Sequence, residues 1–458
     1  MLSKNQIKDD YFELINAIRH TDTNDVKGLS IESNMSWPTV NQKIRVLDEE
    51  GYILINERGE RRFSVNPKQG YFLGISVGVL DTKVCLLDFS FEHVKIGNSV
   101  SKNINSFVEK IVDDLAVLRI RKLETEDDEY LKFSRCTDYS CIYRVCTAII
   151  SSAVDNLDSN RYKLLSIGIS LPGIVDKDSG SLEFSPNFTS LVGLKISNII
   201  GNSIQEKLAE REIFFHIYHD TLAAIAYEKE CLYLENDLNK RKKSIAIMYL
   251  EYGFGCSYIL QNRLLDTATG EFGHINISFN EDDIDDESKR GLISESSYSY
   301  YINDERETND QIIQIEHLPL CSCGNKSCLE RLIRVHAFNS NDIDNYIVKT
   351  TSSNLSQYPQ KHPYRYSKFK HLLSIVINTT VNLITPDLLI LSGEILNSIP
   401  NLKDDLEFKM YNSALKPSSK HCSIINGTSR NDVAAAGAAI LSYYHKYSET
   451  EELNVYWK

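Results

Sequence analysis

The sequence predicts an α/β protein of two lobes, preceded by a small helical domain that ends in a hairpin. Before residue 68, helical patterns come first and two short strands follow. After residue 70, apolar strands alternate with helices in two successive sets, which is typical of a two-lobed α/β protein. A chain of 458 residues is also too long for one ordinary hydrophobic core, so more than one domain is expected.

The composition is that of a globular protein in a reducing compartment. Hydrophobic residues make up 42% and charged residues 25% of the chain, and the absence of a run of about 18 apolar residues argues against a membrane span. The N-terminal segment lacks the apolar region of a secretory signal, which favours a cytoplasmic location. There, the ten cysteines are expected to be thiols or metal ligands. The net charge of −13 argues against a protein that coats nucleic acid, but a small DNA-reading domain needs only one basic face.

Residues 1–68 have the order of elements of a winged helix-turn-helix domain. Apolar residues recur at helical spacing between residues 8 and 20, and a short second helical segment follows. A third helix is expected at 37–50, with Ser36 as its N-cap. Residues 52–66 then suggest two short strands around a turn. Three helices followed by a hairpin predict a winged helix-turn-helix domain at residues 1–68.

In such domains the third helix enters the major groove and the hairpin, or wing, contacts phosphates. The expected partner is therefore a DNA operator. The alternative interpretation is a helical cap with a solvated hairpin. The candidates for DNA contact are four residues of the third helix and three arginines of the wing: Thr39, Asn41, Gln42, Lys43, Arg58, Arg61 and Arg62.

The two α/β lobes are expected at residues 70–195 and 196–458. A polar segment at about 278–317 interrupts the second lobe, and six of the seven residues from 281 to 287 are acidic. A connection of this length is either functional or disordered. We expect it to be an exposed insertion, and its residues indicate no particular chemistry.

Three cysteines within eight residues indicate a zinc knuckle. Cys321, Cys323 and Cys328 offer three thiolates, and tetrahedral zinc requires one more ligand. His274 is the natural fourth ligand, although it lies 47 residues before Cys321. A closed site with four protein ligands makes the zinc structural. The alternative is three unliganded cysteines in a loop, and the absence of a Cys–His nucleophile pattern disfavours a catalytic thiol.

Two of these motifs together resemble the ROK family, which contains sugar kinases and sugar-responsive repressors. GEFGHI at 270–275 is similar to the family's E-x-G-H motif, and CSCGNKSCLE at 321–330 is similar to its zinc motif, with Ser327 where the family usually has glycine. Other segments follow those of the family in order: 170–176, 185–188, 382–395 and 431–441. The resemblance covers roughly residues 70–445 and implies a two-lobed sugar-kinase/actin-like (ribonuclease H-like) α/β region. The N-terminal domain matches the repressor branch.

The resemblance also implies a sugar site between the lobes. Sugar hydroxyls suit carboxylate acceptors, and polar groups aimed at them discriminate strongly between ligands. His219 stands where the kinases of the family have asparagine, which places doubt on one ligand contact. The positions that match the family's ligand-binding residues, or adjoin them, are Asn187, His219, Asp220, Glu271, His274 and Glu330.

The first phosphate-binding segment departs from that of the kinases. They carry D-x-G-G-T after the first strand, whereas this chain has SVGVL at 76–80, with Val79 and Leu80 where phosphate would approach. We therefore expect no kinase activity and interpret Asp220, the family's catalytic position, as a ligand acceptor. The leading function is a sugar-responsive transcriptional regulator, in particular a repressor, acting as a homodimer or homotetramer. One alternative is a sugar kinase with Asp220 as base; another is a sensor that acts through a protein partner and not through DNA.

Overall fold

The computed structural model describes residues 11–21, 25–56, 62–78, 82–94, 139–159, 163–176, 181–185, 188–195, 199–234, 242–251, 253–265, 270–276, 299–302, 311–314, 321, 323, 325, 328–330, 332–333, 356, 358–361 and 363–447. Several positions singled out from the sequence lie outside these residues: Arg58, Arg61, Val79, Leu80, Asn187 and most of the insertion at 278–317. Among the described residues, no helix is long and apolar enough to cross a membrane.

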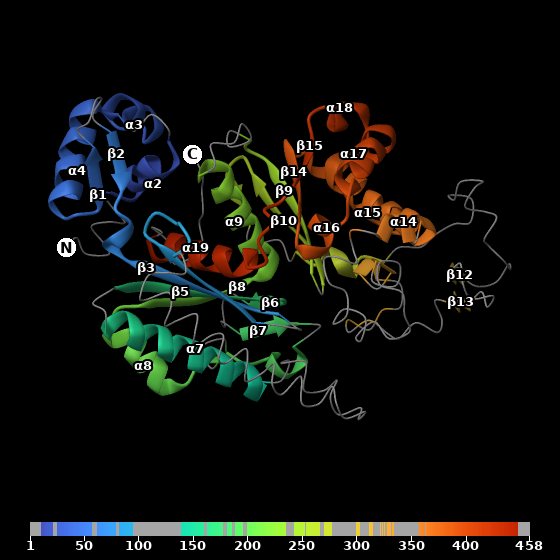
Figure 1. Ribbon diagram of the computed structural model, residues 1–458, viewed down its shortest axis with the longest axis horizontal. Helices are drawn as coiled ribbons and strands as arrows, with labels where there is room; N and C mark the ends of the chain where they lie inside the picture. Colours follow the sequence, from blue (N-terminus) through green and yellow to red (C-terminus); the bar gives the residue numbers. More distant parts are fainter. Residues whose placement is uncertain are drawn as a thin grey trace. The chain divides into compact units, whose positions relative to one another are not determined.

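The chain divides into two compact units. The first unit contains residues 1–243, 258–268 and 430–458, and the second contains residues 244–257 and 269–429. Figure 1 shows the ribbon coloured along the sequence. Each unit is described separately below.

The N-terminal domain has the predicted order of elements. Three helices, α2 (Phe12–His20), α3 (Val26–Glu32) and α4 (Trp37–Glu49), precede the antiparallel hairpin of β1 (Ile53–Asn56) and β2 (Arg62–Val65). The Ser36 side chain accepts a hydrogen bond from the Thr39 amide and so caps α4. Gly51 follows that helix with φ of 75°, a left-handed conformation that glycine adopts without steric cost.

A four-stranded sheet follows this domain in the first unit, with strand order β4-β3-β5-β8. Its strands are β3 (Tyr71–Val77), β4 (Thr82–Asp88), β5 (Leu164–Leu171) and β8 (Phe214–His219). Strand β3 pairs antiparallel with β4 and parallel with β5, and β5 pairs parallel with β8. A small hairpin is formed by β6 (Ile174–Asp176) and β7 (Ser181–Phe184).

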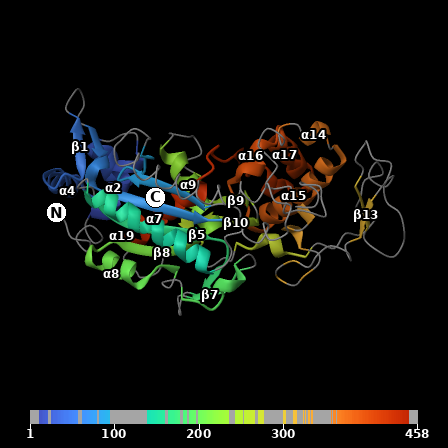
Figure 2. The ribbon, with the colours of Figure 1, turned by 60° about the horizontal axis from the view of Figure 1, so that its bottom comes forward.

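Helices cover both faces of this sheet. Helix α7 (Tyr139–Ser159) runs along one face, beside α8 (Asn202–Glu210) (Figure 2). Helices α9 (Asp220–Leu234) and α19 (Val433–Tyr447) pack together on the other face (Figure 1). A Cβ atom at Gly74 or Gly168 would clash with a backbone carbonyl of α19, so these glycines allow that helix to lie directly on the strands.

The first unit does not follow the expected boundary between residues 195 and 196. Strand β8 extends the same sheet by pairing with β5, and α19, at the C-terminal end of the described chain, contacts β3 and β5. Burial of these apolar surfaces against one another therefore places residues 199–234 and 430–447 with the first sheet. The lobe boundary predicted at residue 195 is therefore corrected, because these later residues belong to the first unit.

The N-terminal domain is seated on the first sheet unit through the end of α2. Arg19 donates a hydrogen bond to the backbone carbonyl of Phe89 at 2.9 Å, and its guanidinium lies over the rings of Phe91 and Tyr443 at 3.8 and 4.6 Å from their centroids. Cation–π contacts in a desolvated place are worth about 2 kcal/mol each. The N-terminal domain is thus packed against α19 and the turn that follows β4.

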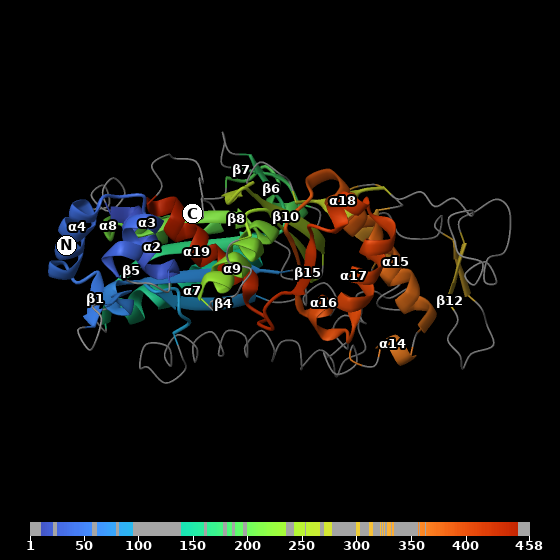
Figure 3. The same ribbon diagram turned by 90° about the horizontal axis from the view of Figure 1, so that it is seen from above.

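The second sheet has the order β11-β10-β9-β14-β15. Its strands are β9 (Ile245–Leu250), β10 (Phe254–Leu260), β11 (Arg263–Leu264), β14 (Leu388–Ser392) and β15 (Ser423–Asn426), and β14 pairs in parallel with both β9 and β15. The helices of the second unit are α14 (Tyr358–Lys361), α15 (Pro363–Ile384), α16 (Glu394–Ser398), α17 (Leu402–Ser413) and α18 (Lys416–Ser419). Helices α15 and α17 lie side by side (Figure 3). Within the insertion, β12 (Ser299–Ile302) and β13 (Gln311–Gln314) pair antiparallel.

Candidate functional site

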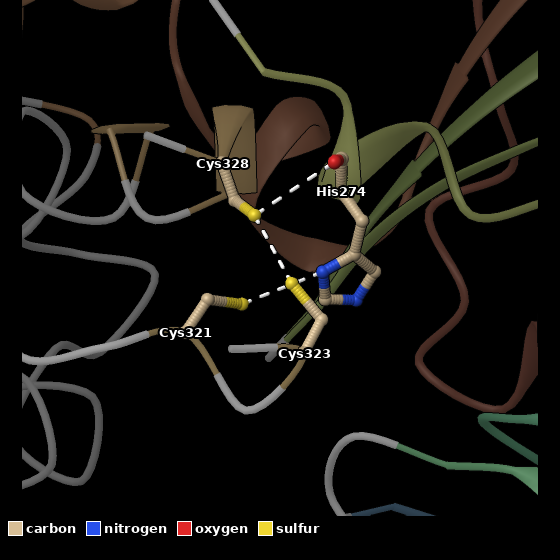
Figure 4. A group of neighbouring side chains, drawn as sticks. All are labelled: His274, Cys321, Cys323 and Cys328. Atoms are coloured by element: carbon tan, nitrogen blue, oxygen red, sulfur yellow. Dashed lines mark hydrogen bonds between the residues drawn. The ribbon is translucent and has the colours of Figure 1, made fainter. Parts of the chain in front are cut away.

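The predicted zinc ligands come together in the second unit. The nitrogen of His274 and the sulfurs of Cys321, Cys323 and Cys328 all lie within 4.8 Å of one another (Figure 4). The His274 Nδ1 is 3.4 Å from the Cys321 sulfur, and the Cys323 and Cys328 sulfurs are 3.3 Å apart. No disulfide links the cysteines of the described residues. Three soft sulfur donors and one imidazole fit tetrahedral Zn²⁺.

Backbone pairing closes the gap of 47 residues between the histidine and the first cysteine. His274 ends a short 3₁₀ helix (Phe272–His274), and Asn276, two residues later, forms an isolated antiparallel bridge with Cys328. The amide of Leu329 also donates to the carbonyl of Ile275 at 3.0 Å. The predicted metal ligands are therefore brought together by main-chain hydrogen bonds between the two motifs.

The electrostatics of the cluster suit a thiolate site. The hydrogen bond to Cys321 raises the pKa of His274 to about 9. Burial opposes ionisation of Cys321, but the hydrogen bond from His274 holds the pKa of that thiol at about 6. A thiolate is the form that binds zinc, and a bound metal would take the place of the proton now shared with the imidazole.

The predicted ligand-binding carboxylates of the second unit adjoin the metal cluster. While Nδ1 of His274 faces the cysteines, its Nε2 lies 3.4 Å from Oε2 of Glu271. Such a carboxylate orients a metal-bound imidazole. Glu330 is buried, and its Oε2 accepts a hydrogen bond from the Phe254 amide at 3.0 Å. Glu271, His274 and Glu330 are thus neighbours, as their motifs predicted.

The other two predicted ligand residues that the structure describes belong to the first unit. His219 ends β8 and Asp220 begins α9. Asp220 Oδ1 accepts a hydrogen bond from the Thr221 amide at 2.7 Å and lies 3.3 Å from Nδ1 of His219. The Thr221 hydroxyl is 2.8 Å from the same imidazole nitrogen. A carboxylate at a helix N-terminus is favoured by the helix dipole, and this arrangement fixes its direction.

In the first phosphate-binding segment, Ser76 and Val77 still belong to strand β3. They pair with Lys83 and Thr82 of β4, and the Val77 side chain is buried. The residues expected to obstruct phosphate, Val79 and Leu80, lie outside the described residues. The loss of phosphate binding stays a prediction.

The candidate DNA-contacting face lies on α4. Asn41 and Gln42 are exposed, and Thr39 and Lys43 are half-buried. Three of these side chains already have local partners: the Thr39 hydroxyl meets that of Ser36 at 2.8 Å, Asn41 donates to the carbonyl of Trp37 at 3.2 Å, and Lys43 lies 5.0 Å from the ring centroid of Tyr11.

On the wing, Arg62 is exposed at the start of β2. The first turn of α4 also exposes 54% of the Trp37 side chain, which the sequence patterns did not single out. The available signal was an aromatic residue directly after the N-cap Ser36, at the first position of the helix. Trp37 joins the candidates for contact with DNA.

Comparisons with known proteins identify the family. The ROK family profile matches residues 116–444. Two curated relatives, the xylose repressors of Caldicellulosiruptor bescii and Bacillus subtilis, are each 24% identical, over 309 and 313 residues. These matches cover 65% and 66% of this chain but only 56% and 59% of the relatives, so the chain spans less than two thirds of their length.

A solved structure supports the fold. The crystal structure of a ROK family transcriptional regulator, described as a homologue of the E. coli MLC protein, matches 96% of this chain and 97% of its own with a TM-score of 0.59 and 16% sequence identity. This likeness confirms the predicted fold class, an N-terminal winged domain followed by a two-lobed α/β region. Because the family profile spans most of the chain, the chain belongs to the ROK family.

Proposed function

We propose that this protein is a sugar-responsive transcriptional repressor that binds an operator through its N-terminal domain. The main support for this proposal is that helix α2 of the N-terminal domain packs against the same unit that contains Asp220. The names of the two curated relatives support a repressor, and they make xylose the first sugar to test. The proposed ligand residues are Asn187, His219, Asp220, Glu271, His274 and Glu330.

Helix α9 offers a physical connection between the two functions. It begins at Asp220, and one of its buried residues, Glu230, contacts the end of α2. The two residues are ten positions apart, which corresponds to about 15 Å along a helix axis. A sugar that displaces the first turn of α9 would therefore act on the contact that holds the DNA-binding domain. Coupling requires that the sugar bind the two positions of α9 with different free energies.

Zinc in the His274–Cys321–Cys323–Cys328 cluster is proposed to be structural. It would join residues 270–276 to 321–330 and hold His274 and Glu271 in place for the sugar. Two N-terminal domains that read a palindromic operator must lie about one helical turn of DNA apart, or a multiple of it. We therefore propose that the protein acts as a homodimer or homotetramer. We propose the cytoplasm as its location.

The proposal is tested with the protein's own upstream DNA. We expect retardation of that DNA by the purified protein, and a change in its affinity when xylose or another sugar is added. If no upstream DNA is bound above the level of random duplex, the repressor function is wrong and a sensor acting through a protein partner is favoured. Consumption of ATP in the presence of a sugar, lost on Asp220→Asn, would support the kinase instead.

A further inference from the structure

A second group of potential metal ligands lies in the first unit, in a different unit from the zinc knuckle. The sulfur of Cys85, a ring nitrogen of His93 and a carboxylate oxygen of Asp432 all lie within 4.8 Å of one another. Cys85 is on β4, His93 follows the turn after that strand, and Asp432 directly precedes α19. Cys85 is buried, and the side chains of His93 and Asp432 are only 23% and 12% exposed.

Neighbouring groups orient all three donors toward the same point. Nε2 of His93 lies 3.1 Å from the Tyr227 hydroxyl, which leaves Nδ1 directed at Asp432, 3.8 Å from its Oδ2. The Gly74 amide is a hydrogen-bond donor to the sulfur of Cys85. Arg430 holds the carboxylate of Asp432 with two hydrogen bonds of 2.7 Å. Hydrogen bonds between neighbouring groups and the ligand side chains are characteristic of metal sites.

The turn that carries His93 is firmly built. Oδ1 of Asp88 accepts hydrogen bonds from the amides of Ser90 and Glu92, and His93 forms an isolated bridge with Leu87. The position of the imidazole is therefore set by the backbone. A metal ion that binds here would meet an imidazole that is already in position. Its binding would not have to order the turn that carries His93.

A simple polar cluster does not account for the arrangement. The separation of 3.8 Å between Nδ1 and Oδ2 is too long for a hydrogen bond. Nδ1 of His93, Oδ2 of Asp432 and the sulfur of Cys85 therefore lie close together without a direct hydrogen bond between the imidazole and the carboxylate. A cation placed among these three atoms would be within reach of all of them.

The spacing suits zinc. Zn–N and Zn–O distances of about 2.0–2.2 Å and a Zn–S distance of about 2.3 Å place neighbouring ligands of a tetrahedron roughly 3.3–3.6 Å apart. The observed 3.8 Å between Nδ1 and Oδ2 needs a contraction of only a few tenths of an ångström. We propose that Cys85, His93 and Asp432 bind a second Zn²⁺ ion, or a divalent transition metal of similar softness, with water in the fourth position.

This site differs from the knuckle in its ligands and in its consequence. It would link β4, the following turn and α19, and Tyr227 ties it to α9. The same turn presents Phe89 and Phe91 to Arg19 of the N-terminal domain. A bound metal would therefore fix the surface on which the DNA-binding domain rests. The inference goes beyond the proposed function, since it holds whether or not a sugar is sensed.

Metal analysis of the full chain tests the proposal. After dialysis against Zn²⁺ and removal of unbound metal, wild type is expected to retain about two zinc ions per chain. Cys85→Ala and His93→Gln should each lose one ion, whereas Cys146→Ala, which removes a buried thiol of α7 outside both clusters, should lose none. Retention of the wild-type zinc content by Cys85→Ala would overturn the second site.

X-ray absorption on wild type gives an answer that does not depend on the folding of any variant. The knuckle supplies three sulfurs to its ion and the second cluster supplies one. Two occupied sites should therefore show about two sulfurs per zinc on average. One zinc per chain with three sulfurs would mean that only the knuckle binds metal, and the proposal would be wrong.

Discussion

His20, the last residue of α2, places its Nε2 2.8 Å from Oε2 of Glu230, a fully buried carboxylate on α9. The Tyr444 hydroxyl of α19 donates to the other carboxylate oxygen at 2.6 Å, and the His20 ring stacks on Tyr233 with a centroid distance of 4.5 Å. A buried carboxylate is costly to desolvate unless partners satisfy it. The N-terminal domain thus supplies part of the environment that Glu230 requires.

Glu230→Gln is expected to lower the free energy of unfolding at pH 7 by about 1–3 kcal/mol, because a neutral amide cannot replace a charged acceptor between His20 and Tyr444. Denaturant unfolding followed by circular dichroism measures the change. Glu206→Gln, which alters an exposed glutamate of α8, is the matched control and should change little.

The same variant predicts a pH dependence. Burial alone would raise the pKa of Glu230, but the interactions with His20 and Tyr444 lower it from 4.5 to about 2. A carboxylate with a lowered folded-state pKa stabilises the fold above pH 4.5, and this contribution is lost as pH falls toward 2. The stability difference between wild type and Glu230→Gln should therefore shrink between pH 5 and pH 3. A difference that is constant over that range would show that folding does not change the pKa of Glu230, and a difference that grows as pH falls would show that folding raises it.

Removal of the knuckle zinc is expected to destabilise the second unit. Cys323→Ser should lose one zinc ion. It should also lower the free energy of unfolding by more than about 3 kcal/mol, because the bound metal would hold the two motifs together. Metal analysis and thermal unfolding check both effects, and a strong chelator should reproduce the thermal loss in wild type. Cys422→Ala removes a buried thiol of the same unit outside the cluster and should keep the metal. A chelated wild type that melts at the same temperature would contradict a structural zinc.

Local signals made the N-terminal domain predictable. Ser36 and Gly51 delimit α4 through a side-chain cap and a left-handed residue, both of which depend on residues close in sequence. The three cysteines indicated a metal site through their spacing, and His274 was chosen as the fourth ligand from its residue type, a choice that the family resemblance then supported. The sequence did not show how His274 and Cys321, far apart along the chain, come together, because the bridge between Asn276 and Cys328 is a long-range backbone pairing.

Three further features could not be predicted from the sequence because they depend on packing between segments far apart in the chain. The position of α19 on the first sheet depends on glycines such as Gly74, whose meaning is visible only when the helix is in place. The cluster of Cys85, His93 and Asp432 joins segments far apart in the chain, and no single segment has the spacing of a metal motif. Burial of Glu230 was equally hidden, since its partners come from α2 and α19.

Two substitutions in the N-terminal domain should affect DNA binding in different ways. Gln42→Ala removes an exposed side chain of α4 and is expected to cost about 1–3 kcal/mol at the preferred operator while reducing discrimination between sequences. Arg62→Ala should weaken binding to all sequences similarly and reduce the slope of log affinity against log salt by about 1. Fluorescence anisotropy at several salt concentrations measures both.

Arg144→Ala is the control for the loss of one positive charge elsewhere in the first unit, since Arg144 lies exposed on α7. It should leave both the affinity and the salt slope nearly unchanged. An Arg62→Ala protein with the wild-type salt slope would remove β2 from the DNA interface.

Glu330→Gln separates ligand binding from folding and from catalysis. The amide oxygen can still accept from the Phe254 amide, so the fold should be retained, while a sugar hydroxyl loses a charged acceptor. Loss of such a hydrogen bond is worth about 1.5–3 kcal/mol, or roughly a 10- to 150-fold weaker affinity for the sugar. In a thermal-shift series, a sugar at about 100 times its dissociation constant stabilises wild type by about 2.7 kcal/mol, and Glu330→Gln should need correspondingly more sugar. Asp404→Asn, an exposed carboxylate of α17, should respond as wild type does. If Glu330→Gln and wild type shift equally with every sugar that shifts either, the ligand does not contact Glu330, and the site between the motifs is structural only.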